Sequence, residues 1–125
     1  MTTLRIQLPF LRPPLSMNDR KHWSYRQRQS KLLRTTACVL TRQERNAKRI
    51  HVLPPIVIDL VWIVTDNRRR DADNPAATRK PVVDGVCDAL GIDDDWRTVS
   101  GGVRIEKGET AGLWVEVRQA SEATE

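Results

Sequence analysis

The first residues of the chain alternate between hydrophobic positions and polar or proline positions. The hydrophobic ones are Leu4, Ile6, Leu8 and Phe10. A period of two is typical of a strand with one buried face. Pro13-Pro14 ends this pattern, and residues 15–25 show no clear period. The sequence therefore predicts a strand over 4–10 followed by a loop.

A helical period runs from Arg26 to about Arg49. Its apolar stripe contains Leu33, Ala37, Leu40 and Ala47. The opposite face carries Arg28, Lys31, Arg34, Arg42, Arg45 and Lys48, and Glu44 is the only acid in the segment. Ion pairs within the helix cannot neutralise such a face. It is either simply solvated or in contact with DNA, and its nearly single sign favours DNA.

Ile56–Val64 is an apolar, β-branched run in which Asp59 is the only charge. It predicts a central strand covered on both faces. The amphipathic segment Pro75–Leu90 follows, with Asn74 as its expected N-cap. Because Pro81 falls inside this segment, we expect either a kink there or a helix whose regular part starts near it.

Residues 98–106 and 113–117 have strand patterns separated by a polar turn, which predicts a hairpin. Residues 119–125 form a polar tail. Together these elements predict a single α/β (α+β) domain over residues 1–118. It should contain a small mixed sheet of about four strands and two main helices.

The charge is unevenly distributed. Residues 1–50 contain twelve Lys and Arg against two acids, a net +10, and residues 51–125 contain nine against fourteen, a net −5. A basic half beside an acidic half predicts a face that binds a polyanion, next to a cluster of carboxylates with a different function. The hydrophobic content of 39% suits a modest core, with some apolar surface buried in a dimer.

Several classes of protein do not fit the sequence. Cys38 and Cys87 lie in apolar helical patterns and are expected to be buried free thiols. His22 and His51 have no partners at zinc-site spacing. No apolar run approaches the roughly 20 residues of a membrane span, and Met1–Arg12 is too short and too charged for a signal peptide. We therefore expect a cytoplasmic protein with no membrane partner.

Asp71 and Asp73 follow the central strand directly after Arg68, Arg69 and Arg70. In an extended chain, residues two apart point the same way. Two parallel carboxylates can share a hard cation such as Mg²⁺, which can activate a water and neutralise charge on a phosphate. The arginines would hold a phosphodiester beside that cation. Without a cation they would only neutralise the aspartates.

The acidic run 93–95 is either a solvated turn or the part of the chain that completes the metal site. In the second case Asp95 would be the ligand, with Asp94 beside it. Lys80 precedes Asp84 by four residues, so the two are neighbours on a helix. They form either a surface ion pair or a site at which Lys80 stabilises charge developing on the phosphate.

The loop over 15–25 contains Asn18, Arg20 and Lys21, which suit phosphate and base contacts. The alternative is an exposed loop anchored by a tryptophan. Trp96 adjoins the acidic run. It could stack on an unpaired base, but we favour a packing anchor.

The order and spacing of these motifs resemble the RusA-type Holliday junction resolvases, a family of crossover junction endodeoxyribonucleases. The resemblance covers about residues 4–99. It rests on Arg-Asp-Ala-Asp-Asn at 70–74, Lys80, Val83-Asp84-Gly85, Asp94-Asp95, Leu8-Pro9-Phe10, and the Pro-Pro-x-Ser-x-Asn loop at 13–18.

This resemblance implies a small α/β homodimer, of bacterial or phage origin, that resolves four-way DNA junctions in recombination and repair by paired symmetric nicks. It implies Mg²⁺ as cofactor, with Mn²⁺ as a substitute. By position, Asp71, Asp73 and Asp95 match the family's essential aspartates and Lys80 its essential lysine. Asp94 matches the acid beside the last aspartate.

The sequence departs from the family pattern. Lys80 lies seven residues after Asp73, where some members have four. Asp93 turns the acidic pair into a triplet, so Asp94 and Asp95 stay alternative ligands. Two prolines replace better helix formers. A straight helix over 75–90 would span about 24 Å. Asp95 could then reach Asp73 only if the chain doubles back, if the helix bends, or if a partner subunit supplies one of them.

Two other interpretations compete with a junction resolvase. The first is a non-catalytic DNA-binding module in which the carboxylates only balance the arginines. The second is a related metal nuclease that acts on fork or flap DNA.

Overall fold

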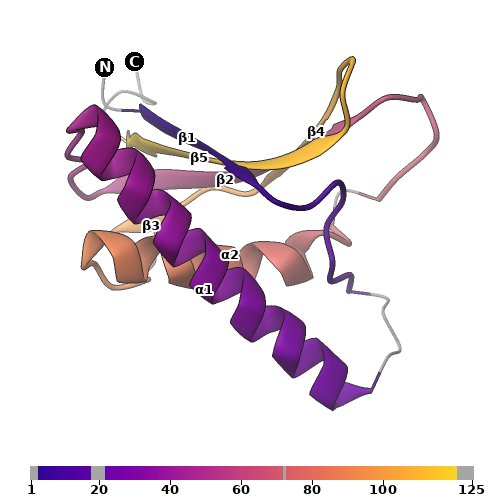
Figure 1. The fold of residues 1–125 in the computed structure, drawn as a ribbon, viewed down its shortest axis with the longest axis horizontal. Helices are drawn as coiled ribbons and strands as arrows, with labels where there is room; N and C mark the ends of the chain where they lie inside the picture. Colours follow the sequence, from indigo (N-terminus) through magenta and orange to yellow (C-terminus); the bar gives the residue numbers. More distant parts are fainter. Residues whose placement is uncertain (1–2, 18–21, 72, 121–125) are drawn as a thin grey trace.

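A computed structural model describes residues 3–17, 22–71 and 73–120. Within these ranges the elements are β1 (Thr3–Leu8), α1 (Trp23–Lys48), β2 (Ile56–Val64), α2 (Ala76–Leu90), β3 (Val99–Ser100), β4 (Val103–Lys107) and β5 (Gly112–Gln119). Figure 1 shows both helices on the same face of one sheet. The predicted α+β class and pair of helices are confirmed for the described residues, with five strands rather than about four.

β2 lies inside the sheet, as its apolar sequence predicts. It pairs antiparallel with β5 on one side and parallel with β3 and β4 on the other, and β1 pairs antiparallel with β5. The predicted hairpin between 98–106 and 113–117 is therefore wrong. The connection between β4 and β5 instead crosses the end of β2, where the Gly108 amide donates to the Val64 carbonyl at 2.9 Å. β2 therefore has neighbouring strands along both of its edges, and its first six residues, 56–61, are all buried.

The strand predicted over 98–106 is interrupted at Gly101 and Gly102. Gly101 has φ 119°, and a Cβ there would lie 2.2 Å from the Ile58 carbonyl oxygen. The Gly102 amide donates to Oδ1 of Asp59 at 2.9 Å, and its carbonyl accepts from the Leu60 amide at 2.9 Å. Asp59, the charge inside the apolar strand, therefore fixes the break between β3 and β4.

α1 begins at Trp23 rather than at Arg26. The Nδ1 atom of His22 accepts from the Ser24 amide at 3.1 Å, which caps the first turn. This cap explains why the helix starts inside the segment expected to be a loop. The buried side chains of α1 are Leu33, Ala37 and Thr41.

α2 is continuous over Ala76–Leu90 although Pro81 lies inside it. Pro81 has no N–H to donate to the Ala77 carbonyl, so one hydrogen bond of the helix is lost there, and the helix continues past it to Leu90. The N-cap is Pro75, with no side-chain cap, so the prediction of Asn74 as N-cap is wrong. Within the described ranges, neither helix is both long and apolar enough to cross a bilayer.

The two helices approach closely at Gly85. A Cβ there would lie 2.2 Å from the carbonyl oxygen of Arg34 and 2.9 Å from Cβ of Ala37. Between the helices and the sheet, the fully buried side chains include Leu4, Leu33, Ile58, Leu60, Val82, Val86, Leu113 and Val115. This packing fixes α2, and with it the residues at its N-terminal end.

The two cysteines are free, as predicted, but only Cys87 is buried, and Cys38 is partly exposed. Burial, more than the nearby acids, raises the pKa of the Cys87 thiol to about 11. A thiol in that state is a packing residue rather than a nucleophile.

Candidate functional site

Two segments that are distant in sequence meet near the N-terminal end of α2. The hydroxyl of Thr78 donates to the Leu15 carbonyl at 2.7 Å, and the Leu15 amide donates to that hydroxyl at 2.9 Å. The Met17 amide donates to the Asn74 carbonyl at 3.0 Å. The proline-rich loop and the Arg-Asp-Ala-Asp-Asn motif, which both carry the resemblance, therefore lie side by side.

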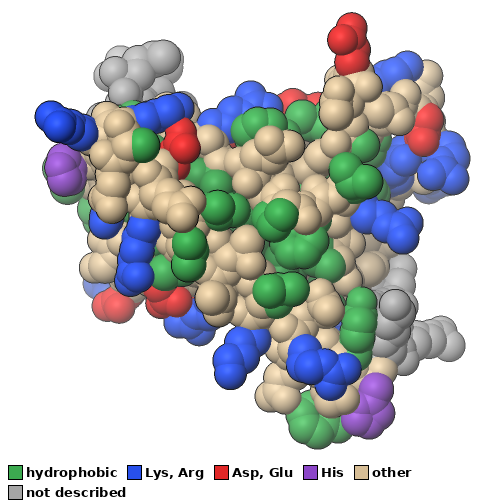
Figure 2. Space-filling model, viewed as in Figure 1, with side chains coloured by type: hydrophobic (Ala, Val, Ile, Leu, Met, Phe, Trp, Pro, Cys, Tyr) green, Lys and Arg blue, Asp and Glu red, His purple; other side chains and the backbone are tan. Residues whose placement is uncertain are grey.

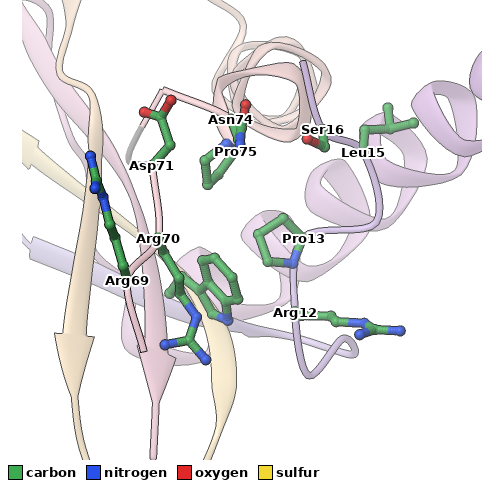
Figure 3. Close-up of a pocket in the computed structure, with 10 residues that line it drawn as sticks. Arg12, Pro13, Leu15, Ser16, Arg69, Arg70, Asp71, Asn74 and Pro75 are labelled. Atoms are coloured by element: carbon green, nitrogen blue, oxygen red, sulfur yellow. The ribbon is translucent and has the colours of Figure 1, made fainter. Parts of the chain in front are cut away.

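A cavity of about 320 Å³ lies between these segments. Figure 3 shows Asp71 and Asn74 on one side of it and Pro13 and Ser16 on the other. The rest of its lining is Arg12, Leu15, Trp62, Arg69, Arg70 and Pro75. Because three arginines and one aspartate share this lining, the cavity can attract a phosphate and still offer an oxygen ligand to a cation.

Asp71 and Asp73 are both exposed at this end of α2. Oδ1 of Asp71 accepts from the Asp73 amide at 3.0 Å, and the Asp73 carbonyl accepts from the Ala76 amide at 3.1 Å. Asp73 therefore already belongs to a turn, and the expected extended pair is not what the structure shows. The reason is local, since aspartate side chains favour such turns. Exposure leaves both carboxylates accessible to a hydrated cation, so they fit Mg²⁺.

The three predicted phosphate-binding arginines differ in their surroundings. Arg70 forms a two-point ion pair with Asp66 at 2.7 and 3.2 Å, and its guanidinium lies 5.2 Å from the centre of the Trp62 ring. The hydrogen bonds from Arg70 hold the pKa of Asp66 well below its usual range. Arg68 also reaches Asp66, at 3.4 Å. The ion pairs recorded for the described residues do not include Arg69, which is exposed and available to a phosphate.

Lys80 connects α2 with the acidic loop. Its Nζ lies 2.9 Å from Oδ1 of Asp84 and 2.7 Å from Oδ2 of Asp94. The hydrogen bonds to Asp94 and then to Asp84 raise the pKa of Lys80. The predicted helical neighbours Lys80 and Asp84 are confirmed, and Asp94 joins them because the chain after α2 doubles back along the helix.

Asp95 is directed to a different partner. Its Oδ2 accepts from Arg97 at 3.0 Å, and its Oδ1 accepts from the Arg97 amide at 2.9 Å. The Arg97 side chain, followed by its backbone, lowers the pKa of Asp95. Of the two alternative ligands, Asp94 is thus the one beside Lys80.

A single chain does not gather the predicted metal ligands into one group. Among the described residues, no set of three or more His, Cys, Asp or Glu side chains is placed to hold a metal ion. Asp71 and Asp73 lie at the start of α2, whereas Asp94 contacts Lys80 farther along that helix. The carboxylates therefore belong to two neighbouring groups.

The basic surface of α1 is partly used within the fold. Arg28 and Lys31 are exposed, and Figure 2 shows basic side chains following this helix. Arg34, however, pairs with Asp88 of α2 at 2.7 Å, and Arg45 donates to the backbone of α2 at 2.7 Å. The surface predicted to contact DNA is therefore narrower than the sequence pattern indicates. The other predicted DNA contacts, Asn18, Arg20 and Lys21, lie outside the described residues.

Sequence reasoning missed two features of this region and misjudged a third. Arg12 lines the cavity, and its place beside the Pro-Pro pair was the only available signal. Arg79 is partly buried and donates to the carbonyl of Ile58 at 2.9 Å, so it holds α2 on the sheet next to Lys80. Trp96 is 86% exposed, so the packing anchor expected there is wrong. The hydrogen bonds of its loop, rather than its ring, hold that loop in place.

No protein-family model matches this chain, and no curated protein matches it at a significant level. The likeness to RusA-type resolvases therefore stays a resemblance carried by the motifs themselves.

Proposed function

We propose that this protein is a Mg²⁺-dependent endodeoxyribonuclease that acts as a homodimer on four-way DNA junctions and resolves them by paired symmetric nicks. The main support is the hydrogen-bonded contact between the two motif-bearing segments through Leu15, Thr78, Met17 and Asn74. Residues about 60 positions apart meet at one cavity with arginines and Asp71 in its lining. A phosphate and a cation could be held there together.

Each residue would have a distinct role in this site. Asp71 and Asp73 would hold the cation, because Mg²⁺ commonly takes one or two carboxylates and completes its shell with water and phosphate oxygens. When bound, Mg²⁺ would supply an activated water and neutralise charge on the phosphate. Arg69 would position the phosphodiester. Lys80, kept charged by two carboxylates, would stabilise charge on the leaving oxygen.

The remaining carboxylate of the site is proposed to come from the second subunit. Asp71 and Asp73 form no single metal-holding group with Asp94 or Asp95 within the described part of one chain. A dimer could bring the two acidic groups together across its two-fold axis. Mixing Asp73→Asn subunits with Asp95→Asn subunits tests this: a shared site leaves one intact site in each heterodimer, whereas unshared sites leave none.

A cleavage gel tests the proposed activity directly. The substrates are a four-way junction, a fork, a flap and a linear duplex, each with Mg²⁺ or with a chelator. We expect symmetric nicks in the junction with Mg²⁺ only. Asp73→Asn should abolish cutting yet keep junction binding, and Glu109→Gln, an exposed acid in the turn between β4 and β5, serves as the matched control. If Asp73→Asn removed binding as well, a direct metal role would be in doubt.

The ion pairs of this region favour one alternative function. Lys80 pairs with Asp94, Arg97 with Asp95, and Arg70 with Asp66. A non-catalytic DNA-binding module would use its carboxylates in this way. It would bind DNA equally well with and without Mg²⁺ and would nick none of the four substrates. A fork or flap nuclease would cut those substrates in preference to the junction.

A further inference from the structure

Trp96 is the most exposed large hydrophobic side chain in the described part of the chain. Two other tryptophans, Trp62 and Trp114, each have an arginine guanidinium over the ring, at 5.2 and 4.8 Å. The ring contacts recorded for the described residues include none for Trp96. Covering an exposed indole with a flat partner is favourable, because it removes apolar surface from water.

The loop that presents Trp96 is held by its own hydrogen bonds. The Thr98 hydroxyl donates to the Asp93 carbonyl at 2.9 Å, and the Val99 amide donates to the Asp95 carbonyl at 2.8 Å. The Arg97 amide donates to the Asp95 carboxylate at 2.9 Å. Because the turn is already ordered, little conformational entropy is lost when a ligand stacks on its tryptophan.

We propose that Trp96 stacks on an unpaired base at the branch point of the DNA, an inference that rests on the proposed function. Trp96 follows Asp94 by two residues, and Asp94 contacts Lys80. A base on the indole would bring its phosphate towards Lys80 and Arg97. Those two cations already pair with Asp94 and Asp95, which reduces the repulsion between the acidic loop and a phosphate.

Stacking of this kind distinguishes branched from linear DNA. Every base has a π-face, so stacking on an aromatic side chain tolerates any sequence. In a continuous duplex both faces of each base are covered by neighbouring bases, whereas a branch point exposes some of them. Trp96 would therefore add affinity for junctions and little for linear duplex.

The test uses a four-way junction with 2-aminopurine at the branch point, a base whose emission is quenched when it stacks. Ca²⁺ replaces Mg²⁺, and binding is measured in the same titration. The wild type should quench the emission. Trp96→Ala should not, and it should weaken junction binding about 5- to 150-fold while duplex binding changes less than about twofold. Trp96→Phe should keep much of the quenching.

Leu53→Ala provides the matched control. Leu53 is also a large exposed side chain, at 65%, and it lies three residues before Ile56, whose amide donates to the Thr98 carbonyl. It should behave as the wild type. Equal quenching by the wild type and Trp96→Ala would overturn the inference. So would a shift from dimer to monomer in Trp96→Ala, because Trp96 would then belong to a protein interface.

The outcomes separate this inference from the nuclease proposal. A wild type that quenches through Trp96 but cuts no junction would support stacking and end the nuclease assignment. If the wild type cuts junctions while Trp96→Ala binds and quenches as well as the wild type, the nuclease proposal is supported and the stacking inference is overturned.

Discussion

Thr78 and Leu15 exchange two hydrogen bonds through a single hydroxyl group. The hydroxyl donates to the Leu15 carbonyl at 2.7 Å and accepts from the Leu15 amide at 2.9 Å. Thr78 is fully buried and Leu15 nearly so. This contact attaches the N-terminal loop to α2 beside the cavity, so the shape of the site depends on a residue that no candidate chemistry involves.

Thr78→Val should therefore damage the site without touching its charges. Valine has nearly the shape of threonine, but it leaves the amide and carbonyl of Leu15 buried without partners, at a cost of about 1–3 kcal/mol per group. We expect a lower urea midpoint and faster proteolysis of the N-terminal loop. Thr78→Ser, which keeps the hydroxyl, is the control. Equal loss in both variants would show that the methyl group, not the hydrogen bonds, matters.

Gly85→Ala should destabilise the packing of the helices. Alanine is favoured over glycine in a helix by about 1 kcal/mol. Here the added Cβ would lie 2.2 Å from a backbone oxygen of Arg34, and backbone cannot move aside cheaply. The cost of overpacking, typically about 1–3 kcal/mol and occasionally more, should exceed the gain in helix propensity at so short a distance and lower the melting temperature. Gly102→Ala, with no atom within 4 Å of the added Cβ, should change the melting temperature much less.

The elements of the fold could be predicted where burial follows from a local period. The strand β1 and the helices α1 and α2 have such a period, and the inner strand β2 has a continuous apolar run instead. The strands that β4 and β5 pair with could not be predicted, because the neighbours of a strand depend on how the whole sheet packs. Gly101-Gly102 carried a signal for the break after β3, but the role of Asp59 in fixing it depends on β2 lying alongside.

In the candidate site, too, some contacts could be predicted from the sequence and others could not. The contact of Lys80 with Asp84 follows from a spacing of four residues on a helix. The contact of Lys80 with Asp94 depends on the path of the chain after α2, which no local pattern specifies. Likewise, the partner of Arg70 is Asp66, from the same loop, rather than either aspartate of the motif.

The ion pair of Asp66 and Arg70 should make stability depend on pH. The pKa of Asp66 is lowered in the fold, chiefly by the Arg70 hydrogen bonds. The unfolded chain has the ordinary value of about 3.9. The pair therefore contributes fully above about pH 4, and its contribution is lost as the pH falls from there towards the lower folded pKa.

Asp66→Asn measures that contribution. The difference in urea midpoint between wild type and variant should be largest at neutral pH and should shrink below about pH 4. Added salt should also reduce it, since Asp66 is partly exposed. A difference that stays constant between pH 7 and pH 2 would contradict a charged pair as its origin.

Arg69 and Arg70 are adjacent in sequence, but substitution of Arg69 should affect DNA binding and substitution of Arg70 should affect stability. Arg69 is exposed in the lining of the cavity, so Arg69→Gln should weaken DNA binding. The slope of log K against log salt should fall by about one, as for the loss of one phosphate contact. The melting temperature should not change. Arg70→Gln should instead lower the melting temperature, because Asp66 loses its two-point ion pair and Trp62 loses the guanidinium over its ring.

Arg5→Gln is the control that separates stability from DNA contact. Arg5 also lies over a tryptophan, at 4.8 Å from the Trp114 ring, and pairs with Glu116 at 3.5 Å. It belongs to β1 and not to the lining of the cavity. Arg5→Gln should therefore lower the melting temperature slightly, by the loss of a cation–π contact worth about 0.5–1 kcal/mol at an exposed site, and leave the salt slope unchanged. If Arg69→Gln also left the slope unchanged, Arg69 would not contact a phosphate, and the cavity would lose its candidate anchor for DNA.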